Sequence, residues 1–216
     1  LKEDATDNGY ARPIHGLIAH LDVTAKKVVH VEDTGVIPMP PSSGRFDSAH
    51  QEETRTDLKS LDITQPEGAS FTTEGYRVKW QGYDLRVSIH PVHGLVLHQM
   101  SLKGRPVLYR AALSEMIVPY GDADNMHSWK HVLDASEYNM GTLVNSLKLG
   151  CDCLGEIHYF DIHQVTWDGK ARTVENAICM HEEDYGIQWK HYDLMTQVSE
   201  VRRSRRLVIS SIFTVG

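Results

Sequence analysis

The chain has 216 residues, of which 41% are hydrophobic and 24% are charged, and its formal net charge is −7. This composition is typical of a globular protein with one large domain, or with one domain and part of another. The acidic balance argues against a nucleic-acid partner, and no apolar run approaches the ~20 residues that cross a bilayer, so we expect no membrane partner either. The arginines between Arg202 and Arg206 are typical of a solvated or ion-paired face.

The first part of the chain predicts a β-hairpin followed by a long connection. Two β-rich runs, at residues 16–22 and 27–33, flank a Thr24-Ala25-Lys26 turn. A loop rich in proline and serine follows at residues 38–44, and the polar stretch after it continues through Lys59. This composition favours an exposed, poorly packed connection.

From Tyr76 onward, short strands recur between turn signals. The run at residues 83–90 alternates cleanly, as a half-buried antiparallel strand does. Similar runs predict further strands at residues 77–80, 94–102, 105–110, 156–162, 174–180, 187–190 and 207–215. Only residues 111–117 and 128–137 look helical or turn-like. The pattern predicts a mostly β fold in which one sheet packs on another. Because the last strand ends without a cap or a polar tail, we expect the natural polypeptide to continue.

Histidine and cysteine patterns do not predict a metal site within this chain. His90-Pro-Val-His93 has HxxH spacing, but on a strand this spacing sends the two rings to opposite faces. No HExxH motif occurs. Cys151-Asp-Cys153 lacks the two-residue spacing of zinc and thioredoxin-type sites. With Cys179, the three cysteines allow either one disulfide and one free thiol or three buried thiols.

Four blocks, in this order and spacing, resemble the copper amine oxidases. They are Met116-Ile-Val-Pro-Tyr-Gly-Asp122, Leu133-Asp-Ala-Ser-Glu-Tyr138, Leu149-Gly-Cys-Asp-Cys-Leu-Gly155 and Ile178-Cys-Met-His-Glu-Glu-Asp-Tyr-Gly186. The similarity extends upstream to residues 7–10 and 63–68. The resemblance implies a small α+β domain and linker ending at residue 59, followed at residues 60–216 by the first part of a large antiparallel β-sandwich catalytic domain.

The resemblance also implies roles for individual residues. Asp134 matches the base that removes a proton from the substrate, and Tyr120 matches a tyrosine whose hydroxyl hydrogen-bonds the quinone cofactor. The positions that match the family's substrate channel are Val132, Leu133, Tyr138 and Gly216. Because some members have a bulky aromatic gate where this chain has Val132, the channel here is expected to be wider or differently closed. Without the resemblance, Asp134 would read as an exposed turn residue or a helix cap, and Tyr120 as the anchor of a turn.

For the cysteines, the resemblance implies a disulfide between Cys153 and Cys179, with Cys151 left as a free thiol. The run from Met180 to Tyr185 is expected to be structural, supporting the strand next to this disulfide.

The implied activity is oxidative deamination of primary amines by O2 to aldehyde, ammonia and hydrogen peroxide. The implied cofactors are copper(II) and topaquinone, and the topaquinone is made from a tyrosine just after Gly216. Both cofactors are therefore expected to be held by polypeptide outside this chain. The implied partners are the remainder of that polypeptide and a second copy in a homodimer. An inactive homologue and a non-enzymatic β-sandwich binding module are the alternatives. The particular amine and the cellular compartment stay open.

Overall fold

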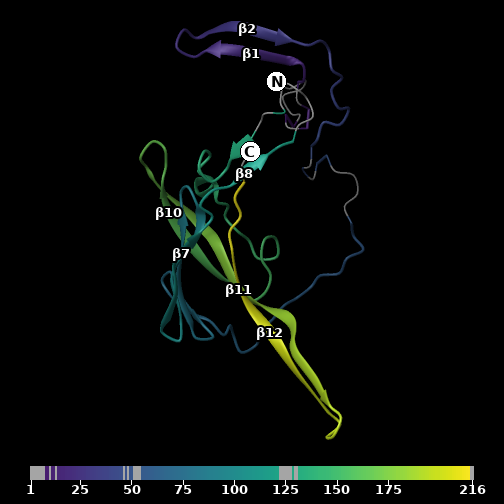
Figure 1. The fold of residues 1–216 in the computed structure, drawn as a ribbon, viewed down its shortest axis with the longest axis vertical. Helices are drawn as coiled ribbons and strands as arrows, with labels where there is room; N and C mark the ends of the chain where they lie inside the picture. The colour runs from purple at the N-terminus through teal and green to yellow at the C-terminus, as the bar shows by residue number, and fades with distance from the viewer. Residues whose placement is uncertain are drawn as a thin grey trace. The chain divides into compact units, whose positions relative to one another are not determined.

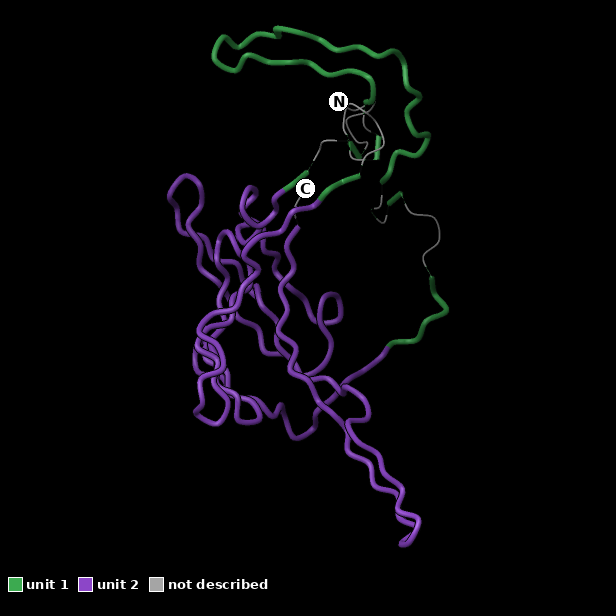
Figure 2. The backbone as a smooth tube through the Cα atoms, in the orientation of Figure 1, with its two compact units in different colours: residues 1–60, 119–132 green, residues 61–118, 133–216 purple. Residues whose placement is uncertain are grey.

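The computed structural model describes residues 8–9, 11–12, 14–45, 47, 49–50, 55–121, 128 and 131–214 (Figure 1). Contacts divide the chain into two compact units (Figure 2). The first unit contains residues 1–60 and 119–132, and the second contains residues 61–118 and 133–216. Within the described residues, the structure has no helix with the length and apolarity needed to cross a bilayer.

The predicted hairpin is confirmed in the first unit. Strand β1 (Leu17–Asp22) pairs antiparallel with β2 (Lys27–Asp33). The turn is closed by the Asp22 carboxylate, which accepts hydrogen bonds from the backbone N–H groups of Thr24 at 3.0 Å and Ala25 at 2.8 Å. An aspartate that binds the backbone two and three residues onward replaces the hydrogen bonds that the strand ladder no longer supplies.

A five-stranded antiparallel sheet forms one layer of the second unit. Its strands follow one another in chain order and are β3 (Thr72–Glu74), β4 (Arg77–Trp80), β5 (Tyr83–His90), β6 (Gly94–Leu102) and β7 (Arg105–Ala112). The tight turn between β4 and β5 places Gln81 at φ 47° and Gly82 at φ 85°, and glycine adopts this left-handed conformation without steric cost.

A three-stranded antiparallel sheet forms the other layer. It contains β10 (His158–Val165), β11 (Ala171–Asp193) and β12 (Val198–Ser210), with β11 in the centre. One core cluster joins the layers, in which Val78, Leu85 and Val87 pack with Phe160, Ile178 and Met180. The predicted sheet-on-sheet β fold is therefore confirmed, because the alternating apolar residues of both sheets meet in a shared interior.

Several elements differ from the sequence-based expectation. Residues 111–117 are not helical: β7 continues to Ala112, and residues 113–116 form a loop. In the second segment expected to be helical or turn-like, the described residues form β9 (His131–Leu133) and a turn at residues 134–137, and β9 pairs with β8 (Ile117–Pro119). The only helical element among the described residues is the 3-10 helix η1 (Met140–Leu143).

The last two strands form one long hairpin, where separate shorter strands were expected. β11 continues through residues 174–180 and 187–190 without a break, and β12 begins at Val198 rather than at residue 207. Figure 1 shows the turn end of this hairpin extending away from the sheets of the second unit.

Candidate active site

Asp134 lies in a turn that is fixed by backbone hydrogen bonds on both sides. Its N–H donates to the carbonyl oxygen of Met116 at 3.0 Å, and its own carbonyl oxygen accepts from Met140 N–H at 3.1 Å. These bonds tie the turn to the segment before β8 and to the start of η1. The residue is only 8% exposed. The alternative of an exposed turn aspartate is therefore wrong.

The Asp134 side chain lines a cavity of about 520 Å³ within the second unit. Only one other polar residue, His93, lines the same cavity. The remaining lining residues are apolar: Leu95, Leu113, Met116, Met140 and Phe213. A mostly apolar cavity with few polar groups is the usual form of a small-molecule site.

The Asp134 carboxylate has an unsatisfied hydrogen-bonding capacity. Its Oδ1 atom is shielded from water and has no hydrogen-bond partner in the described structure. A buried polar atom without a partner costs free energy, so in the whole protein we expect this oxygen to meet a ligand, a water molecule or a donor from another part of the polypeptide. The chemistry available to a carboxylate held in this way is proton transfer or binding of a cation.

The turn also brings two of the predicted channel residues together with Asp134. The carbonyl oxygen of Leu133, the last residue of β9, accepts from the N–H groups of Glu137 at 2.7 Å and Tyr138 at 3.3 Å. Leu133 is partly buried, and Tyr138 is 52% exposed. Neither of these side chains is part of the lining of the 520 Å³ cavity.

The other predicted site residues are assigned to the first unit or lie outside the described residues. Val132 lies on β9 and is partly buried, and Tyr120 follows β8 and is 52% exposed; both are assigned to the first unit. Gly216 lies outside the described residues. Their joint roles with Asp134 stay predictions.

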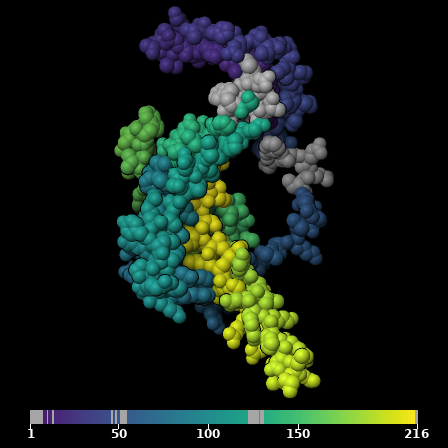
Figure 3. Space-filling view, in the orientation of Figure 1, coloured from purple at the N-terminus to yellow at the C-terminus, as the bar shows by residue number. Residues whose placement is uncertain are grey.

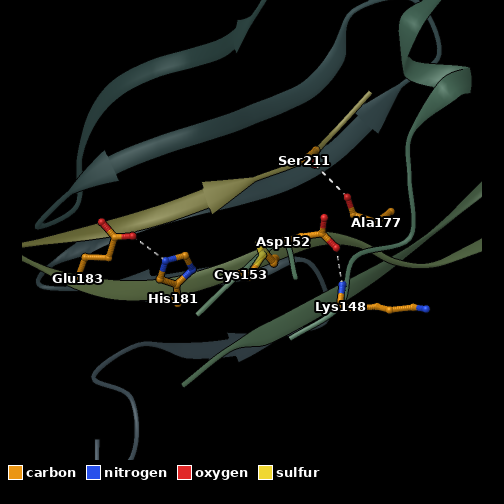
Figure 4. Close-up of a disulfide and its surroundings, with 8 residues drawn as sticks. Lys148, Asp152, Cys153, Ala177, His181, Glu183 and Ser211 are labelled. Carbon is orange, nitrogen blue, oxygen red and sulfur yellow. Dashed lines mark hydrogen bonds and ion pairs between the residues drawn. A yellow bond between two sulfur atoms is a disulfide. The ribbon is translucent and has the colours of Figure 1, made fainter. Parts of the chain in front are cut away.

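The predicted disulfide is present between Cys153 and Cys179, whose Cα atoms are 6.9 Å apart (Figure 4). Both cysteines are buried in a small cluster with Leu147, against which Ile157 and Tyr159 pack. Cys151 is an exposed free thiol, as expected. The disulfide ties the loop before β10 to the central strand β11.

We expect removal of this disulfide to lower the free energy of unfolding by about 3 kcal/mol, because the crosslink restricts the unfolded chain over a separation of 26 residues. The test is urea unfolding of a Cys153→Ala/Cys179→Ala double variant. Cys151→Ser is the matched control and should change stability by less than about 0.5 kcal/mol. Equal unfolding midpoints for the double variant and the wild type would contradict a stabilising role.

The run after Met180 contains a buried carboxylate that the sequence did not single out. Glu182, on β11, is 4% exposed. Its oxygens accept from Gln65 Nε2 at 2.7 Å, from Ser70 N–H at 2.7 Å and from Trp80 Nε1 at 2.9 Å. Arg205 on β12 lies 3.6 Å away. Burial alone would raise the pKa of Glu182, but these hydrogen bonds outweigh it and lower the pKa to about 2.

Glu182 therefore has a structural role, joining the segment before β3, strand β4 and strand β11. The neighbouring His181 is also buried, and its Nε2 lies 2.9 Å from Glu183 Oε1 (Figure 4). Both contacts agree with the expectation that this run supports the strand next to the disulfide. The sequence does not distinguish Glu182 from its neighbours Glu183 and Asp184, and it gives no signal for three donors that lie more than 100 residues away.

The expectation for the HxxH pair is wrong. His90 ends β5 and His93 lies in the following turn, so the two residues do not share a strand. Their rings are in contact, with centroids 4.6 Å apart in an edge-to-face arrangement. Among the residues that the structure describes, no three His, Cys, Asp or Glu side chains converge as a metal site. We therefore assign no copper ligand to a described residue.

Comparisons with known proteins agree with this architecture. The family model "Copper amine oxidase, enzyme domain" matches residues 72–216, more than half of the chain. A primary amine oxidase of Arthrobacter sp. (strain P1) is 52% identical over the whole chain, which covers 34% of that relative. A histamine oxidase of Arthrobacter globiformis is 49% identical over the whole chain, which covers 32% of it.

A solved structure shares the fold as well. The crystal structure of a copper-containing benzylamine oxidase from Hansenula polymorpha superposes with a TM-score of 0.82 at 33% identity, over 99% of this chain and 35% of that one. The chain thus spans about a third of the length of the relatives it matches. By sequence and by fold, this chain belongs to the copper amine oxidase family.

Proposed function

We propose that this chain is part of a primary-amine oxidase that converts primary amines and O2 to aldehydes, ammonia and hydrogen peroxide. The observation that carries the proposal is Asp134, a buried carboxylate with an unpartnered oxygen on the wall of an otherwise mostly apolar cavity. The matches to a primary amine oxidase and a histamine oxidase support the same reaction class.

In this proposal, Asp134 removes a proton from the carbon next to the amine nitrogen. A carbon acid gives up its proton slowly, so the carboxylate must be held at hydrogen-bond distance from that carbon. The backbone bonds to Met116 and Met140 provide this fixed position. The Oδ1 atom is shielded from water, which would otherwise compete for it.

The cofactors of the proposed enzyme are copper and topaquinone, held by the remainder of its polypeptide. When bound, the quinone accepts the two electrons of the amine. The cavity fits this partnership because it offers one carboxylate base and an apolar wall for the substrate carbons. Tyr120 is proposed to orient the quinone ring through its hydroxyl. The proposed substrate channel is lined by Val132, Leu133, Tyr138 and Gly216.

The experiment combines a quinone stain with a peroxide assay on the whole protein. We expect redox staining of the denatured protein for quinone, bound copper by elemental analysis and hydrogen peroxide release on addition of a primary amine. A protein with no stain and no peroxide would be an inactive homologue or a binding module, and the proposed activity would be wrong. The binding-module alternative explains the β layers but not the family match across residues 72–216.

For domain organisation, we propose that residues 1–59 are the end of a small α+β domain and its linker. Residues 60–216 would then be the first part of the β-sandwich catalytic domain. The family model for the enzyme domain begins at residue 72, which supports a boundary in the preceding connection.

We also propose that the protein is a homodimer and that the β11–β12 hairpin takes part in the interface. Figure 3 shows this hairpin, in yellow-green and yellow, extending from the sheets. Its exposed apolar side chains include Trp189, Tyr192, Leu194, Met195 and Val198, of which Met195 is 92% exposed. Exposed apolar side chains gathered on one element are typical of a protein interface.

A Leu194→Asp/Met195→Asp variant is expected to shift the dimer toward monomer, because it places two charges in an apolar contact. Light scattering coupled to size-exclusion chromatography measures the mass. Lys170→Asp at the exposed β10–β11 turn is the control for added negative charge. If the double variant kept the mass of the wild type, the hairpin tip would not be part of the interface.

A further inference from the structure

The turn between β5 and β6 is folded around the imidazole of His90. His90 Nδ1 accepts hydrogen bonds from the backbone N–H groups of Val92 at 3.2 Å and His93 at 3.3 Å. An acceptor at Nδ1 requires that the ring proton is on Nε2. Burial, and then the neighbouring His93 and Arg110, lowers the pKa of His90, so this ring is neutral near pH 7. The neutral ring of His90 also packs against His93 and holds it in place.

The two ring nitrogens of His93 have different surroundings. Nδ1 is shielded from water and has no hydrogen-bond partner. Nε2 is not among the shielded atoms and makes no hydrogen bond to a described residue. A buried N–H without an acceptor is rarer and more costly than a buried lone pair without a donor. The ring proton of His93 therefore belongs on Nε2.

His93 and Asp134 are thus the two polar side chains on the cavity wall, and they have opposite hydrogen-bonding characters. The Asp134 carboxylate accepts, while Nε2–H of His93 donates. The other lining residues have apolar side chains, which suit the carbon atoms of a substrate. A substrate that presents the carbon next to its amine nitrogen to Asp134 and also satisfies His93 needs a hydrogen-bond acceptor some distance from the amine.

We propose that His93 is a specificity-determining residue whose Nε2–H binds an acceptor on the substrate remote from the amine nitrogen. This inference rests on the proposed amine oxidase function and deepens it. The preferred substrates are then primary amines that also carry a hydroxyl, an ether or an unprotonated ring nitrogen. Diamines fit less well, because their second ammonium group has only donors and would face Nε2–H of His93, which is also a donor.

The test compares two amines that differ by one hydroxyl group, tyramine and phenethylamine, in the whole enzyme. For the wild type, kcat/KM is expected to be about tenfold higher for tyramine, which is the effect of one hydrogen bond of ordinary strength. His93→Leu should bring the ratio close to one, with most of the loss falling on tyramine. His93→Gln, whose amide nitrogen can stand in for Nε2, should keep most of the ratio.

His163→Leu is the matched control, because His163 is exposed on β10 and bonds only Thr173, at 3.0 Å. The kcat/KM values of His163→Leu for tyramine and for phenethylamine should both match those of the wild type. The proposal is wrong if the wild-type ratio is one, if His93→Leu keeps the wild-type ratio, or if that variant lowers both rates equally. Failure of the proposed function looks different, since the wild type would then release no peroxide from either amine.

Discussion

Replacement of Asp134 by asparagine is expected to lower amine turnover by about 10³-fold or more, the upper part of the range for a general base. The amide has the shape of the carboxylate but cannot accept a proton from carbon. Because the backbone bonds to Met116 and Met140 do not involve the side chain, the turn should keep its geometry. The measurement is steady-state peroxide release with a primary amine at saturating O2.

Asp62→Asn is the matched control for this variant. Asp62 is exposed and makes no hydrogen bond or ion pair to a described residue, so its replacement should leave turnover within about twofold of the wild type. If Asp134→Asn retained turnover similar to that of Asp62→Asn, the carboxylate would not be the base.

Replacement of Glu182 by glutamine is expected to lower the free energy of unfolding by about 3 kcal/mol at neutral pH. The amide removes the charge that compensates Arg205 and presents N–H groups to donors from Gln65, Ser70 or Trp80. The measurement is urea unfolding followed by tryptophan fluorescence. Glu175→Gln, at an exposed position on the same strand, should change stability by less than about 0.5 kcal/mol.

The pH dependence of this contribution follows from the direction of the pKa shift. The pKa of Glu182 is about 2 in the folded protein and 4.5 in the unfolded reference. A depressed folded-state pKa gives stability that is fully present above pH 4.5 and is lost as the pH falls toward 2. The stability difference between wild type and Glu182→Gln should therefore shrink steadily below pH 4.5. A difference that stayed constant between pH 7 and pH 3 would show that the charge of Glu182 is not the cause.

Four of the five strands of the larger sheet were predictable because their signals are local, whereas β3 (Thr72–Glu74) was not predicted. Alternation in β5 and the tight turns at Gln81-Gly82 and Lys103-Gly104 fix both the strands and their order. The first half of β12 was missed because it is rich in arginine and has no apolar face. It is a strand because its backbone pairs with β11 and because Arg203 and Arg206 form cross-strand ion pairs with Asp184 and Glu183.

The candidate site was predictable only in part. The family resemblance placed Asp134, but the cavity that it lines is formed with Met116, Met140 and Phe213, which come together only in the folded chain. His93 was misjudged because strand periodicity was applied to a turn. The tautomer of His93 depends on which nitrogen is shielded, and residue spacing does not contain this information.

The proposed activity depends most directly on Asp134 as the base beside a quinone, and anaerobic stopped-flow absorbance tests this role. Wild type and Asp134→Asn are first titrated with phenylhydrazine to count reactive carbonyl groups, and fresh samples are then mixed with a primary amine. We expect equal carbonyl counts, with amine-dependent loss of visible absorbance at least about 10³-fold slower in the variant. Equal bleaching rates would show that Asp134 is not the base, and a wild-type protein without a reactive carbonyl would show that the proposed activity is wrong.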